Sequence, residues 1–151
     1  MNIERALLEN PDFRLLRPEE RSAIADAMVE RKVRAGVELI REGGEDSDLY
    51  VILSGRVEVT RRPLSLTEVT RLGELGPGSL IGLVSLVTPG PRSSTCTAAT
   101  DVVVGVLPRS AFNMLYTTSS GFSLRFRTIV AKQIARDLRR LGETIRAAEP
   151  A

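Results

Sequence analysis

The chain has 151 residues, a formal net charge of +2 and no histidine. That length suits one domain with a core of its own, and the near-balanced charge gives no reason to expect nucleic acid or an anionic membrane as partner. Histidine is the usual catalytic base and metal ligand, so its absence weakens most enzyme hypotheses, and that of a cupin-like metalloenzyme above all.

Cysteine content and hydropathy indicate in which cellular compartment the protein is expected. Cys96 is the single cysteine, which excludes an internal disulfide, and its expected role is that of a small buried residue. The sequence has no apolar run near the roughly 18 residues of a membrane span, and no apolar stretch after Met1 of the kind found in secretory signals. We therefore expect a cytoplasmic protein with no membrane partner.

Helical patterns open the chain. A turn around Ala6–Leu8 precedes a segment in which Pro18 suits the first position of a helix. Glu19 and Glu20 suit the first turn of that helix, where the helix dipole is positive. Ile24, Ala27 and Met28 share one face of the helix.

From Val29 the apolar period changes to two, which indicates strands. Leu49–Leu53 is apolar on both faces, as expected of a strand inside a double-layered sheet. Glycine and proline clusters separate further short strands, expected at Val57–Val59, Glu68–Leu72, Leu80–Ile81, Thr95–Ala99 and Val102–Leu107. Many short strands at close spacing predict a β-roll or jelly roll.

After Pro108 the period is helical again. Ser110 is expected to cap a short helix through Met114, and Ser119 or Ser120 to cap a long helix reaching about Ala147. Late in the long helix, apolar residues at coiled-coil spacing predict a homodimer, with packing on the chain's own roll as the alternative; they are Ile134, Leu138, Leu141 and Ile145.

These patterns together predict an α+β fold. N-terminal helices occupy residues 1–29, a double-stranded, jelly-roll-like β-roll occupies 30–108, and C-terminal helices occupy 109–147.

The stretches Gly78–Leu86 and Pro89–Cys96 carry a specific resemblance. They are similar to the phosphate cassette of the cyclic nucleotide-binding domain family, including the sensor domains of catabolite activators. In that cassette, a glycine and two apolar residues precede a second glycine, a short helix and Pro-Arg-Ser. The matching residues are Gly78, Leu80, Ile81, Gly82, Leu86, Pro91, Arg92, Ser93 and Thr95.

The resemblance extends beyond the cassette, which spans residues 78–95. Ile40–Gly43, Asp46 and Leu49–Val59 look like the family's strand-turn-strand signature, and the similarity runs from about Phe13 to Ile145. It implies one domain over 1–151, a regulatory sensor for cyclic AMP or cyclic GMP that relays binding through its C-terminal helix. It implies no catalytic residue, no metal and no other cofactor.

The cassette's chemistry is the capture of an anion. Glycines let backbone approach the ligand, NH groups near the start of the short helix point at it, and an arginine supplies opposite charge. The ligand-binding residues implied by the resemblance are Gly82, Leu83, Val84, Ser85, Arg92 and Ser93. The alternatives are turn geometry for the glycines, a surface position with a nearby carboxylate as ion-pair partner for Arg92, and a strand-edge position for Ser93.

Leu83 departs from the family pattern. Nucleotide-binding members usually have a glutamate here, which accepts the ribose 2′-hydroxyl and helps to hold the arginine, and no carboxylate lies nearby in the sequence to replace it. An unpaired hydroxyl costs about 1–3 kcal/mol, or roughly tenfold to a hundredfold in affinity. The competing hypothesis is therefore a nucleotide-blind member that acts as a dimerisation or docking scaffold.

The long helix raises two further questions. By the resemblance, base contacts fall around Asp137–Arg140, although solvated charge is the competing interpretation. The arginines at 136, 139, 140 and 146 form a basic run, expected to be a solvated face. Catabolite activators place a helix-turn-helix domain after this helix, whereas this sequence stops at Ala151, so we expect no direct DNA binding.

Overall fold

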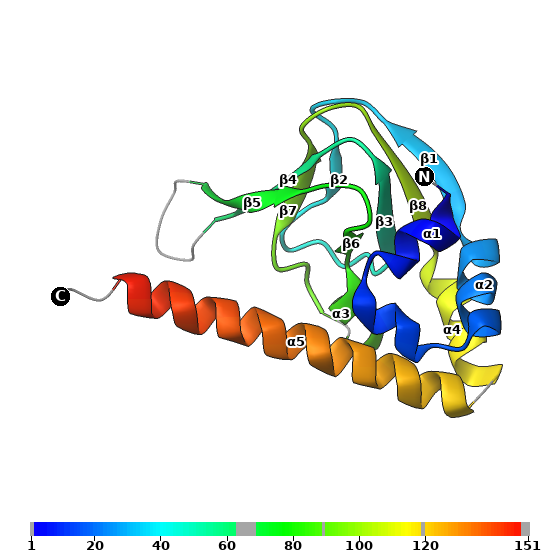
Figure 1. The fold of residues 1–151 in the computed structure, drawn as a ribbon. Helices are drawn as coiled ribbons and strands as arrows, with labels where there is room; N and C mark the ends of the chain where they lie inside the picture. The colour runs from blue at the N-terminus through cyan, green and yellow to red at the C-terminus, as the bar shows by residue number, and fades with distance from the viewer. Residues whose placement is uncertain (1, 63–68, 89, 119, 149–151) are drawn as a thin grey trace.

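A computed structural model describes residues 2–62, 69–88, 90–118 and 120–148, with the backbone alone for 118, 120, 140, 141 and 143–148. Over that part of the chain two four-stranded antiparallel sheets face each other, with helices at both ends of the sequence (Figure 1). The elements are α1 Ile3–Leu8, η1 Pro11–Leu15, α2 Pro18–Ala27, β1 Val29–Val33, β2 Glu38–Ile40, β3 Leu49–Ser54, β4 Val57–Arg61, β5 Thr70–Leu75, β6 Leu80–Ile81, α3 Leu83–Val87, β7 Thr95–Ala98, β8 Val102–Leu107, α4 Arg109–Thr118 and α5 Ser120–Ala148. The predicted α+β fold with a β-roll is confirmed.

Strand β3 lies at the centre of the architecture. The first sheet has the order β1-β8-β3-β6 and the second β2-β7-β4-β5. Leu49, Val51 and Leu53 of β3 pack toward the helices, while Tyr50 and Ile52 pack into the cluster between the sheets. Because β3 is covered on both faces, it is apolar along its length, as the sequence predicted.

The helices pack on the first sheet through an aromatic cluster. Phe112 of α4 contacts Phe126 of α5 with ring centroids 4.9 Å apart, and Phe13 of η1 meets Phe126 edge to face. Buried aromatic pairs of this kind add to the free energy of area burial by about 0.5–1.5 kcal/mol each. The cluster thereby holds both terminal helical segments against the roll.

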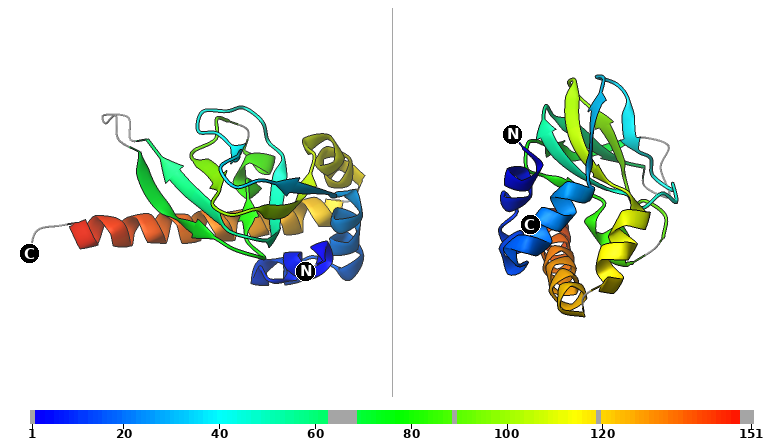
Figure 2. Two further views of the ribbon diagram at one scale, coloured as in Figure 1. Left: turned by 90° about the horizontal axis from the view of Figure 1, so that it is seen from above. Right: turned by 90° about the vertical axis from the view of Figure 1, so that its right-hand side faces the viewer.

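Helix α5 crosses the roll and extends past it. In Figure 1 its first half lies beside the N-terminal helices and α4, and its later part runs on below β4 and β5; the right-hand view of Figure 2, which looks along α5, also shows the first half beside these helices. The inward residues Phe122, Phe126, Ile129 and Val130 are buried, whereas Ile134 and Leu138 are 38% and 63% exposed. The side chains of Leu141 and Ile145 lie outside the described residues.

Several element boundaries differ from the sequence prediction. Val29, which begins β1, is 62% exposed, whereas Val33 at the other end of the same strand is buried. Strand β5 begins at Thr70 and continues to Leu75, while the predicted start at Glu68 lies outside the described residues. Helix α4 begins at Arg109, so Ser110 lies in its first turn and is not its cap, and it continues to Thr118, four residues beyond the predicted Met114.

The ends of the remaining elements agree closely with prediction. The first long helix spans Pro18–Ala27, and β6 and β8 have the predicted bounds. Helix α5 spans Ser120–Ala148; the alternative cap Ser119 and the side chain of Ser120 lie outside the described residues. No helix in the described ranges is long and apolar enough to cross a bilayer.

Candidate functional site

Gly82 sets the geometry of the cassette at the junction of β6 and α3. Its φ of +89° belongs to the left-handed region, which side chains other than glycine rarely adopt. A Cβ at this position would collide with Nη1 of Arg92 and lie 2.8 Å from the carbonyl oxygen of Asp48. Glycine is therefore required here both by the backbone turn and by the approach of the arginine.

Arg92 is buried beneath this turn, with 3% of its surface exposed. Its backbone NH donates to Gly44 O and its carbonyl accepts from the NH of Gly43, each at 2.8 Å. Its Nη2 donates to Asp46 Oδ2 at 2.9 Å and to Asp48 O at 2.8 Å. The first two hydrogen bonds hold the main chain of Arg92, and the two from Nη2 orient its guanidinium.

Two polar atoms of Arg92 stay without a partner. Among the described residues, nothing accepts a hydrogen bond from Nε or Nη1, and both atoms are buried. A buried donor left unpaired costs about 1–3 kcal/mol, and more when it carries charge. A guanidinium held this firmly, with two free donors, is chemically suited to receive an oxyanion.

A cavity of about 210 Å³ lies beside Arg92. It is bounded by the cassette, by the second sheet and by α5. All six residues predicted for the site line it: Gly82, Leu83, Val84, Ser85, Arg92 and Ser93. The structure thus brings together at one cavity the residues that the sequence selected.

The walls of the cavity are mostly aliphatic. Ile40, Val59, Leu75 and Cys96 contribute from the second sheet, and Gln133 and Asp137 from α5. Burial raises the pKa of the Cys96 thiol to about 11, which keeps it protonated near neutral pH and consistent with a packing role.

Leu83 is buried in the core cluster that joins α3 to the helices. The role of holding the arginine, which the resemblance gives to a glutamate at this position, is taken here by Asp46. This contact was not predicted, because Asp46 lies 46 residues before Arg92 and meets it only in the fold. Arg92 thus has a carboxylate partner, as the alternative supposed, but it is buried and does not lie on the surface.

Arg109 fastens the cassette to the rest of the domain. Its Nη1 donates to Ser85 O at 2.9 Å, and its backbone NH donates to Asp48 Oδ1 at 3.0 Å. Asp48 in turn accepts from Arg92 through its carbonyl oxygen. The start of α4, the cassette and the segment before β3 are thus linked by one set of hydrogen bonds.

The contribution of α5 differs in part from prediction. Of the range Asp137–Arg140, Asp137 lines the cavity, Leu138 and Arg139 are exposed, and the side chain of Arg140 lies outside the described residues. Gln133 was missed, although it lies four residues before Asp137 on the same helix face and donates to it at 3.0 Å. The helix period alone would have identified it.

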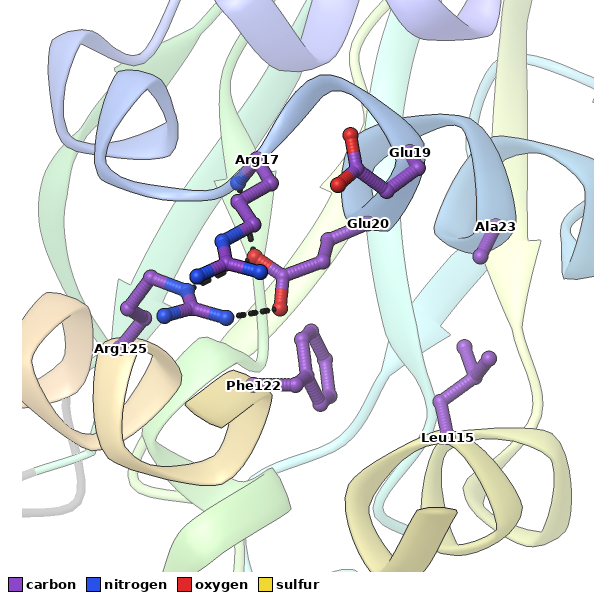
Figure 3. Close-up of a pocket in the computed structure, with 7 residues that line it drawn as sticks. All are labelled: Arg17, Glu19, Glu20, Ala23, Leu115, Phe122 and Arg125. Carbon is purple, nitrogen blue, oxygen red and sulfur yellow. Dashed lines mark hydrogen bonds and ion pairs between the residues drawn. The ribbon is translucent and has the colours of Figure 1, made fainter. Parts of the chain in front are cut away.

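A second cavity, of about 220 Å³, lies between α2, α4 and α5 (Figure 3). Here the Arg125 guanidinium donates through Nε and Nη2 to both carboxylate oxygens of Glu20, at 2.8 and 2.6 Å. Phe122 and Leu115 form an apolar wall beside this pair. Because Glu20 already satisfies Arg125 in a bidentate pair, the second cavity is a weaker candidate for an anion site than the first.

Comparison with known proteins agrees with this geometry. The model of the family described as the cyclic nucleotide-binding domain matches residues 30–119. A cAMP-dependent protein kinase regulatory subunit from Eremothecium gossypii is 29% identical over 118 residues, which are 78% of this chain and 24% of that protein. The chain therefore spans about a quarter of that relative's length.

Solved structures extend the likeness to bacterial regulators. The N-terminal domain of a transcriptional regulator from Streptomyces coelicolor has a TM-score of 0.71 and 30% identity, over 91% of this chain and 95% of that chain. The catabolite activator protein of Thermus thermophilus has a TM-score of 0.76 and 28% identity, over 91% and 62% respectively. The chain belongs to the cyclic nucleotide-binding domain family.

Proposed function

We propose that this chain is a regulatory sensor domain, not an enzyme, whose ligand is a cyclic nucleotide held in the cavity beside Arg92. The observation that carries the proposal is the buried guanidinium of Arg92, which Asp46 and Asp48 hold through Nη2 and whose Nε and Nη1 have no acceptor among the described residues. A cyclic phosphate supplies the oxygen atoms that these donors lack. No other cofactor enters this proposal.

In this proposal a phosphate oxygen accepts from Nε or from Nη1 of Arg92, which lie on different edges of the guanidinium, because Nη2 is already bonded to Asp46 and Asp48. Ser93 adds a hydroxyl, and the backbone NH groups of Leu83, Val84 and Ser85 line the same cavity. The nucleoside lies against the aliphatic wall, with Gln133 and Asp137 of α5 beside it. The ribose 2′-hydroxyl faces Leu83 without an acceptor.

The proposed output is a change in α5. Because two side chains of α5 line the cavity, ligand contacts there shift the helix and the surface that it offers to a partner. The exposed residues Ile134 and Leu138 lie on the predicted coiled-coil stripe and support a homodimer through α5. We place this function in the cytoplasm, without a membrane partner.

A second candidate function is a nucleotide-blind scaffold for dimerisation or docking. Leu83 supports it, because the aliphatic side chain removes the usual acceptor of the ribose hydroxyl. Asp46 supports it as well, because the ion pair neutralises the charge of Arg92 in the absence of any ligand. The two candidates differ in whether a cyclic nucleotide binds, and both include a homodimer.

Calorimetric titration with cyclic AMP and cyclic GMP separates the two candidates. The sensor proposal expects micromolar binding by the wild type and a loss of about tenfold or more in the Arg92→Lys variant, which keeps the charge but loses the planar fork. Thermal melting of both proteins checks that the variant is folded. Absence of binding near millimolar concentrations, with a folded wild type, supports the scaffold and overturns the sensor.

A further inference from the structure

Four side chains form a continuous series of hydrogen bonds from the cavity to the N-terminal segment. Asp137, at the cavity, accepts from Nε2 of Gln133 at 3.0 Å. Gln133 accepts through Oε1 from Nη2 of Arg136 at 3.1 Å, and the same Nη2 donates to Asp12 of η1. The series joins residues that lie more than a hundred positions apart in the sequence, since Asp12 and Arg136 are separated by 124 residues.

The charged groups on either side of Gln133 determine the orientation of its amide. Its oxygen faces the guanidinium of Arg136 and its NH₂ group faces the carboxylate of Asp137. A flipped amide would set donor against donor at Arg136 and acceptor against acceptor at Asp137. Arg136 therefore determines which group Gln133 presents on the cavity side.

Asp12 is a firm anchor for Arg136. It is buried, and its backbone NH is capped by the side chain of Asn10 at 3.0 Å. The next residue, Phe13, is buried against Phe126 of α5. The ion pair between Asp12 and Arg136 therefore joins two elements that are already in apolar contact.

We propose that Arg136 is a positioning residue, which holds Gln133 and Asp137 against the cavity and couples occupancy of the cavity to the docking of η1 on α5. The coupling rests on the proposed function, whereas the positioning of Gln133 by Arg136 does not. A ligand that bonds to Gln133 or Asp137 replaces one partner in the series and so changes the hydrogen bonds available to Arg136 and Asp12. By reciprocity, loosening the Asp12 anchor weakens the ligand.

The chain offers a matched control for the anchor. Glu20 of α2 and Arg125 of α5 also form an ion pair between the N-terminal helices and α5, and both side chains of that pair are largely buried. Neither lines the cavity beside Arg92. Asp12→Asn and Glu20→Gln therefore remove equivalent charges from the same helix packing, but only the first lies on the series that reaches the cavity.

The first readout needs no ligand. In two-dimensional ¹⁵N NMR spectra, Asp12→Asn is expected to shift the side-chain amide resonances of Gln133, and Glu20→Gln to leave them in place. Arg136→Met is expected to shift them in the same direction as Asp12→Asn. Unmoved Gln133 resonances in folded Asp12→Asn protein, or equal shifts in the Glu20→Gln control, overturn the proposal.

The second readout is affinity for cyclic AMP and cyclic GMP by calorimetry. Asp12→Asn is expected to weaken binding about two- to tenfold, whereas Glu20→Gln leaves it unchanged. If both variants lose the same affinity, the coupling is overturned, and both ion pairs only stabilise the fold. If the wild type binds neither nucleotide while Gln133 still responds to Asp12→Asn, the proposed function and the coupling fall but the positioning by Arg136 stands.

Discussion

Arg92 and Asp46 form an ion pair at 2.9 Å although 46 residues separate them, and the arginine side chain is 2% exposed while the aspartate is 46% exposed. A buried guanidinium costs free energy unless it is paired, so Asp46 stabilises the ligand-free site. The partial exposure of Asp46 limits its contribution, because solvent screens the pair. Asp46 and Asp48 together occupy Nη2, and among the described residues nothing accepts from Nε or Nη1.

Substitution of Asp46 tests this relationship. We expect Asp46→Ala to lower the free energy of unfolding of the ligand-free protein by about 1–3 kcal/mol, because it leaves a buried charge with fewer partners. Urea unfolding measures this directly. The neighbouring exposed residue Glu45 provides the control, since Glu45→Ala should change stability by less than about 0.5 kcal/mol. Equal effects at the two positions would show that the ion pair contributes nothing.

Leu83 controls discrimination at the ribose in this account. We expect Leu83→Glu to tighten cyclic AMP binding about tenfold to a hundredfold, because the carboxylate restores an acceptor for the 2′-hydroxyl. The control ligand is 2′-deoxy cyclic AMP, which the wild type should bind as well as cyclic AMP and which should gain nothing from the substitution. A wild type that already favours the ribonucleotide would contradict the role given to Leu83.

The exposed stripe on α5 predicts the oligomeric state. We expect the wild type to sediment as a dimer at micromolar concentration and Leu138→Arg to shift it toward the monomer, because a charge in a coiled-coil seam is costly. Met114 of α4 is similarly exposed, and Met114→Lys serves as the matched control. A dimer that survives Leu138→Arg, or a monomeric wild type, would remove α5 as the interface.

The ion pair at the second cavity predicts an acid-sensitive contribution to stability. Hydrogen bonds from Arg125 lower the pKa of Glu20 below its ordinary value near 4.5, partly opposed by burial. Because the folded-state pKa is depressed, the stabilisation is present above the unfolded-state pKa and is lost as the pH falls through the folded-state pKa.

Unfolding of the wild type and of Glu20→Gln at several pH values measures this contribution. We expect the wild type to be more stable near pH 7 and the difference to shrink progressively below about pH 4.5. A difference that persists unchanged into acid would mean that the carboxylate charge is not its source.

Periodicity and turn residues predicted most of the fold. Leu49–Leu53, Val102–Leu107 and the helix from Pro18 were placed correctly because buried strands and amphipathic helices impose their own spacing on the sequence. The exposure of Val29 was not predictable in this way, since Val29 and the buried Val33 follow the same alternation and differ only in what distant segments cover.

The candidate site was predicted less completely. The glycine and arginine pattern located Gly82 and Arg92, which the structure places at one cavity. Asp46, Asp48 and Arg109 were missed because their contacts with the cassette depend on the fold and leave no local signal. Gln133, by contrast, could have been inferred from its spacing before Asp137 on one helix face.

The most direct test of the central claim is to observe the Arg92 guanidinium itself while a cyclic nucleotide is added. The Nε–H resonance of Arg92 can be assigned in ¹⁵N NMR spectra by its absence from Arg92→Lys protein, and adenosine serves as the control ligand without a phosphate. The account predicts that cyclic AMP or cyclic GMP shifts this resonance in a saturable manner and that adenosine does not. An Arg92 resonance that stays unmoved at millimolar nucleotide would contradict a phosphate site at Arg92.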